Sequence, residues 1–119
     1  MRRTLATLTV LLCGLPIAAC GEDEEPAAGT VEPKVIEVSV EGDSLSPNGE
    51  RVEVSVGQDI ELDITADAPG EIHVHSNPER TLEYGEGEST VTIPGIDTPS
   101  TVEVESHDLD KVIVQLEVR

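Results

Sequence analysis

Aromatic and basic residues are scarce in this chain. Tyr84 is the only aromatic residue among 119, and 25 Asp and Glu stand against 7 Lys and Arg, for a formal net charge of -18. Single-stranded nucleic-acid binding depends on aromatic stacking and on cations that neutralise phosphates, and anionic lipid headgroups also attract basic residues. The composition therefore argues against nucleic acid as a partner, and the length allows one ordinary domain.

The first twenty residues have the features of a secretory signal. Arg2 and Arg3 form a positive start, and an apolar stretch follows over residues 5–16. This stretch is about a dozen residues long, whereas a membrane-spanning helix needs roughly 20. We therefore expect a cleaved signal peptide and not a retained transmembrane helix.

The end of this segment, Ile17-Ala18-Ala19-Cys20, resembles the lipobox of bacterial lipoproteins, in which a Cys follows one aliphatic and two small residues. The resemblance implies cleavage after Ala19, a diacylglycerol thioether on Cys20, and a protein held by its N-terminal lipid on the extracytoplasmic side of the cell membrane. A soluble secreted protein cleaved nearby is the alternative. Because Cys13 would leave with the signal and Cys20 would carry lipid, no thiol would remain for a disulfide, a nucleophile or a thiolate metal ligand.

Three segments are predicted along the chain. Residues 1–19 are the lipoprotein signal peptide. Residues 20–34 have four consecutive acids, two prolines and no hydrophobic period, which is typical of a flexible acidic tether. Residues 35–119 form the folded domain.

The folded segment alternates apolar and polar residues almost throughout. Period two predicts half-buried strands, and the turn residues Gly, Pro, Asn and Asp separate seven such runs. The apolar positions are Ile36, Val38, Val40, Val52, Val54, Val56, Ile60, Leu62, Ile64, Ile72, Val74, Val91, Ile93, Val102, Val104, Val112, Val114, Leu116 and Val118. With a short edge strand expected around Leu82, we predict an all-β sandwich of about seven to eight strands in two antiparallel sheets.

The three histidines are the candidate ligands for a metal. His73 and His75 flank the apolar Val74, so they share the outward face of one strand, and His107 follows another strand. Neutral imidazole suits copper, zinc and nickel. A His-x-His pair on a strand is also common on an ordinary wet surface, so the spacing leaves both interpretations open.

Four segments together resemble small cupredoxin-like domains of bacterial lipoproteins. They are SPNGERVEVSVGQ at 46–58, GEIHVH at 70–75, VEVESHD at 102–108 and VQLEVR at 114–119. The resemblance covers most of residues 35–119 and implies a Greek-key cupredoxin sandwich. It also implies that one copper-ligand histidine follows a central strand, here His75, and that the other ligands come from the loop before the last strand, here around His107.

The chain departs from this family at the copper ligands. A blue-copper electron carrier needs a Cys thiolate and usually an axial Met, yet Ser106 to Asp110 occupies that region and the only Met is Met1. We therefore expect any bound copper to be Cu(II) held by His73, His75 and His107, with Glu105 or Asp108 as oxygen ligands.

Two functions follow from these patterns. The first is a membrane-anchored, extracytoplasmic, non-catalytic cupredoxin-like lipoprotein that binds Cu(II) through its histidines; the alternative is a metal-free structural or protein-interaction module of the cell envelope, with an unknown protein partner. The first predicts that the three imidazoles lie within about 8 Å of one another at one end of the sandwich. An enzyme is not expected, because Ser106 and His107 are adjacent on a strand and point to opposite faces.

Overall fold

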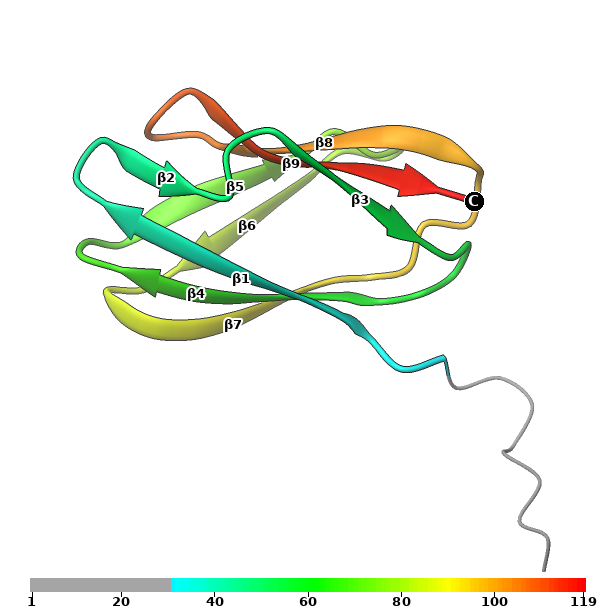
Figure 1. Cartoon of the computed structure of the whole chain (residues 1–119), viewed down its shortest axis with the longest axis horizontal. Coiled ribbons are helices and arrows are strands. Elements are labelled where there is room, and N and C mark those ends of the chain that lie inside the picture. Colours follow the sequence, from blue (N-terminus) through cyan, green and yellow to red (C-terminus); the bar gives the residue numbers. More distant parts are fainter. Residues whose placement is uncertain (1–30) are drawn as a thin grey trace, which may run out of the picture.

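The computed structural model describes residues 31–119 and contains strands and turns but no helix within this range (Figure 1). The predicted signal peptide, the predicted lipidation site Cys20 and most of the predicted tether lie outside the described residues. No helix in residues 31–119 is long and apolar enough to cross a membrane. The nine strands are β1 (Lys34–Glu41), β2 (Ser44–Ser46), β3 (Glu50–Val54), β4 (Ile60–Ala66), β5 (Gly70–Val74), β6 (Arg80–Tyr84), β7 (Gly87–Ile93), β8 (Ser100–Ser106) and β9 (Lys111–Val118).

The strands form two sheets that pack face to face. One has four strands in the order β2-β1-β4-β7, and the other has five in the order β3-β9-β8-β5-β6. Figure 1 shows β1, β4 and β7 side by side in one layer, and β3, β9 and β8 in the other. The predicted β-sandwich is confirmed.

Two strand pairs differ from the prediction of purely antiparallel sheets. β1 pairs with β4 in parallel, and β3 pairs with β9 in parallel. Both pairs join strands that are not consecutive in the chain, because the chain passes from the four-stranded sheet to the other sheet between β2 and β3 and returns at β4. Alternation along one strand reports which side chains are buried, but it carries no information about the direction of the neighbouring strand.

The core consists of the inward side chains of both sheets. Of the predicted apolar positions, Val52, Val56, Val91 and Val112 are not fully buried. The fully enclosed centre comprises Ile60, Leu62, Ile64, Ile72, Val74, Ile93, Val104, Ile113, Val114 and Leu116. Each buried aliphatic side chain contributes roughly 1.5–3 kcal/mol, so the core depends on many small contributions, with Tyr84 as its one aromatic member.

Two of these four positions, Val56 and Val112, differ from the prediction for identifiable reasons. Val56 is 42% exposed because β3 ends at Val54 and the chain turns at Gly57, which has a φ of +76°. In β9 a bulge shifts the register, since Val104 pairs with Val114 but Glu105 pairs with Val112. The extra residue, Ile113, is buried beside Val114, and Val112 is left half-buried.

Candidate metal centre

The three histidines lie on the outward face of the five-stranded sheet. His73 is within β5, His75 follows the last residue of β5, and His107 follows the last residue of β8. Ile72 and Val74 are buried, so the alternation turns His73 and His75 toward solvent, as predicted. The structure thus shows all three to be surface histidines outside the hydrophobic core.

His73 is the middle member of the group. Its ring centroid lies 5.6 Å from that of His75, with the rings edge to face, and 5.6 Å from that of His107. Two imidazoles that bind one ion at about 2.0 Å each have centroids at most roughly 6.5 Å apart. Each of the two pairs therefore has a separation that a single ion could bridge.

The predicted location at one end of the sandwich is wrong. β5 and β8 are antiparallel, so the ends that carry His75 and His107 lie at opposite ends of this strand pair. The backbone bonds mark the two ends: His75 N–H donates to Glu103 O at 2.9 Å, and His107 N–H donates to Glu71 O at 2.9 Å. The imidazoles consequently form a row across the sheet, and no group of three or more potential ligands within residues 31–119 is arranged to hold a metal.

Each ring nitrogen of His75 lies close to a carboxylate oxygen. Its Nε2 lies 2.8 Å from Glu105 Oε2, and its Nδ1 lies 3.5 Å from Glu79 Oε1. The hydrogen bond to Glu105 is the largest cause that raises the pKa of His75 above 6.5, and Glu79 adds to the rise. In the part of the chain that the structure describes, the rings of His73 and His107 have no such hydrogen bond, so this pair is the more accessible to an ion.

Two hydrogen bonds to Glu71 fix the position of His107 in the β8–β9 turn. Asp108 Oδ2 accepts a hydrogen bond of 2.8 Å from Glu71 N–H, directly beside the bond from His107 N–H to Glu71 O. Glu71 precedes His73 by two residues, so these two bonds tie the β8–β9 turn to the strand that carries His73. Asp108 therefore acts as a support for the His73–His107 pair in this structure, in place of the ligand role that the sequence suggested.

Tyr84 completes this support from inside the sandwich. It pairs with Gly70 across β5 and β6, and its side chain lies over Gly70 toward Asp108. Burial raises the pKa of Tyr84 above 10.0, and the negative charge of Asp108 raises it further, whereas a hydrogen bond with Ser106 lowers it. Neither Tyr84 nor Glu79 was predicted to belong to the site. For Glu79, the i, i+4 spacing from His75 is a signal that the sequence contains.

The residues do not fit a blue-copper centre. Residues 31–119 contain no Cys and no Met, and the buried polar side chain at the end of β8 is Ser106, which is 1% exposed and pairs with Ile72 on β5. The Ser106 hydroxyl and the Ile72 side chain cannot replace the thiolate and imidazole ligands that a blue-copper centre needs. The chemistry that remains available to a metal is that of the surface imidazoles.

Comparisons with known proteins support the fold. No protein-family model and no curated protein sequence matches the chain. Among solved structures, a purple cupredoxin from Nitrosopumilus maritimus is 11% identical with a TM-score of 0.52, and the match covers 72% of this chain and 99% of that one. An amicyanin variant in its Cu(I) form is 12% identical with a TM-score of 0.52, over 78% of this chain and 88% of that one. At these identities the comparison establishes the architecture alone, and this chain has a cupredoxin-like β-sandwich.

Proposed function

We propose that this protein is a non-catalytic, cupredoxin-like copper-binding module of the cell envelope that captures Cu(II) at its surface histidines. The single observation that carries the proposal is the position of His73, whose ring lies 5.6 Å from each of two other imidazoles. Neutral imidazole is a good Cu(II) ligand. His73 would hold the ion together with His107, or together with His75 when the bonds of His75 to Glu105 and Glu79 open.

The exposed location of the row determines what such a site would do. His75 and His107 are exposed and His73 is half-buried, so an ion held there would keep coordination positions open to solvent or to a second protein. A buried blue-copper site instead excludes solvent and favours electron transfer. The arrangement therefore supports capture and release of Cu(II) more than electron transfer.

A Cu(II) titration followed by electron paramagnetic resonance tests this proposal. With the full chain in a nonionic detergent, we expect a nitrogen-coordinated signal that H73A reduces most, because His73 belongs to both close pairs. H75A and H107A each leave one pair and should lose less. The matched control is E83Q, which removes an exposed charge of β6, and H73A/H75A/H107A reports binding by carboxylates alone.

A signal that is unchanged in the triple variant would overturn the copper proposal. The second candidate, a metal-free interaction module, would then be favoured. It has its own support in the structure, because Ser106 stands at the buried end of β8 and carboxylates already hold His75.

We also propose that Cys20 carries a lipid that anchors the protein on the extracytoplasmic side of the membrane. The support is the sequence Ile17-Ala18-Ala19-Cys20 after a short apolar stretch. Mass spectrometry of the chain expressed in a bacterium should find a mature N-terminus at Cys20 with added diacylglycerol. C20S should abolish the modification and C13S should not; an unmodified Cys20 in the membrane fraction would contradict the anchor.

A further inference from the structure

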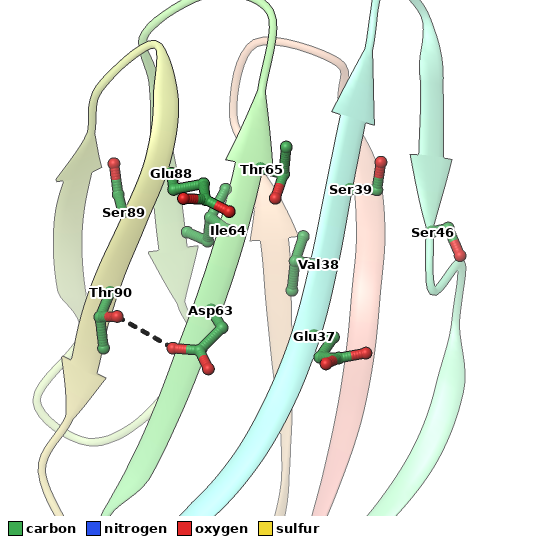
Figure 2. Close-up of a pocket in the computed structure, with 10 residues that line it drawn as sticks. All are labelled: Glu37, Val38, Ser39, Ser46, Asp63, Ile64, Thr65, Glu88, Ser89 and Thr90. Carbon is green, nitrogen blue, oxygen red and sulfur yellow. Dashed lines mark hydrogen bonds between the residues drawn. The ribbon is translucent and has the colours of Figure 1, made fainter.

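The outward face of the four-stranded sheet is an acidic surface that the fold leaves uncovered. Figure 2 shows it as a shallow hollow across β1, β4 and β7, with β2 at its rim, and its volume is about 790 Å³. Within the described residues the second sheet packs only on the inner side of these strands. We call this surface the acidic sheet face and define it by Glu37, Ser39, Asp63, Thr65, Glu88 and Thr90.

The strand register arranges these side chains in two rows. Glu37 pairs with Asp63 and Asp63 pairs with Thr90, which gives one row across three strands. Ser39 pairs with Thr65, and Thr65 pairs with Glu88, which gives the next row. All six side chains are exposed, so each row presents carboxylates and hydroxyls to the same side.

Two of the acids are direct cross-strand neighbours. Like charges on adjacent strands destabilise a sheet, and a neutral residue at Glu37 or Asp63 would avoid that cost. Thr90 Oγ1 donates a hydrogen bond of 2.9 Å to Asp63 Oδ1, which fixes that carboxylate in place. The bond holds Asp63 toward the hollow and leaves its other oxygen free (Figure 2).

Most basic side chains of the described domain lie elsewhere: Lys34 begins β1, whereas Arg51, Arg80, Lys111 and Arg119 belong to the five-stranded sheet or follow its last strand. Within residues 31–119, the arginine ion pairs join Arg51 and Arg119 to Glu53 and Glu117 on the five-stranded sheet. Lys111 Nζ donates to the backbone oxygen of Asp43. Among the described residues none of the three acids of the acidic sheet face forms an ion pair, so its negative charge is not compensated inside the domain.

We propose that the acidic sheet face docks a basic segment of a partner protein, with lysine or arginine side chains that pair with Glu37, Asp63 and Glu88. Charge complementarity selects this occupant. The face has no aromatic ring for stacking a sugar or a base, and no group of three potential ligands within the described chain is arranged for a metal ion. The hydroxyls of Ser39, Thr65 and Thr90 can accept further hydrogen bonds from guanidinium or ammonium groups.

A ¹⁵N NMR titration of the full chain in a nonionic detergent tests this proposal. The probe is a synthetic peptide of alternating Arg and Ser, with an alternating Glu and Ser peptide as the negative control. We expect amide shifts confined to β1, β4 and β7, and an affinity that falls with added salt. Because exposed ion pairs are individually weak, the loss of three of them in E37Q/D63N/E88Q should weaken binding about tenfold.

The matched control is E50Q/E86Q/D97N, which removes three exposed charges outside this face. It should change the affinity less than twofold, and both triple variants should melt no lower than the parent. Equal weakening by the two variants, or shifts spread over both sheets, would overturn the proposal by showing nonspecific attraction. Displacement of the peptide by millimolar Ca²⁺, with saturable shifts at Asp63 and Glu37, would overturn it in favour of a cation site.

Discussion

Gly70 is the position where one added methyl group would disturb both the core and the histidine row. An alanine Cβ at this position would lie 2.6 Å from Asp108 Oδ2 and closer still to Tyr84 Oη. The backbone at Gly70 needs no positive φ, so the effect of G70A comes from crowding and not from backbone strain. Overpacking of this kind costs about 1–3 kcal/mol in stability.

Chemical denaturation of G70A, with G85A as the matched control, measures this cost. A Cβ at Gly85 meets only Ser89 Oγ at 3.8 Å, so G85A should change the free energy of unfolding by less than about 0.5 kcal/mol. In G70A the amide of His107 should also shift in NMR spectra, because Asp108 must move from Glu71. The double variant G70A/Y84A should lose less free energy of unfolding than the two single variants lose together, since the ring that crowds the added methyl group is gone. If G70A and G85A are equally stable, the proposed contact between Tyr84, Gly70 and Asp108 is wrong.

Three further predictions concern the titrating groups and the core. The pKa of His75 should exceed 6.5 in an NMR titration, because Glu105 is the main cause of the rise. In E105Q this pKa should fall toward 6.5, whereas in E83Q it should stay raised. The His75–Glu105 pair stabilises the fold below pH 6.5 and loses its contribution as the pH rises through the raised pKa. Tyr84, the only tyrosine, should ionise above pH 10.0 when its ultraviolet absorbance is followed. The fold should therefore lose stability as the pH rises beyond that value. A Tyr84 pKa at the usual 10.0 would contradict the packing described around this ring. L62A, at a side chain with 0% exposure, should cost about 2–5 kcal/mol in thermal or chemical unfolding, and V56A at an exposed position should cost far less.

Strand positions could be predicted because period-two alternation is a local property of the chain. It correctly turned Ile72 and Val74 inward and His73 and His75 outward. It failed where a long-range interaction decides the local structure. The β9 bulge exchanges Val112 for Ile113 in the core, and this exchange depends on the register against β8. Val56 follows the end of β3, where the chain turns at Gly57.

The histidine residues could be identified from the sequence, but their arrangement could not. The family resemblance gave the order of the elements, with His75 after one strand and His107 before the last. Whether those two positions meet depends on the direction of β5 relative to β8. These strands are antiparallel and adjacent, so the two positions lie apart with His73 between them. The bonds from Glu71 to the β8–β9 turn also required tertiary information, because 37 positions separate Glu71 from Asp108.

The two proposed surfaces lie on opposite outer faces of the sandwich, which makes them electrostatically independent. Paired sheets are about 10 Å apart, and side chains on the two outer faces are farther apart than that. The Debye length at physiological ionic strength is about 8 Å, so charges on one face are largely screened from solvent-exposed charges on the other. An ion at His73 should therefore hardly change the attraction of the acidic sheet face for a basic segment. It follows that loss of copper binding in H73A would leave peptide docking intact, and that neutralising Glu37, Asp63 and Glu88 would leave the copper signal intact.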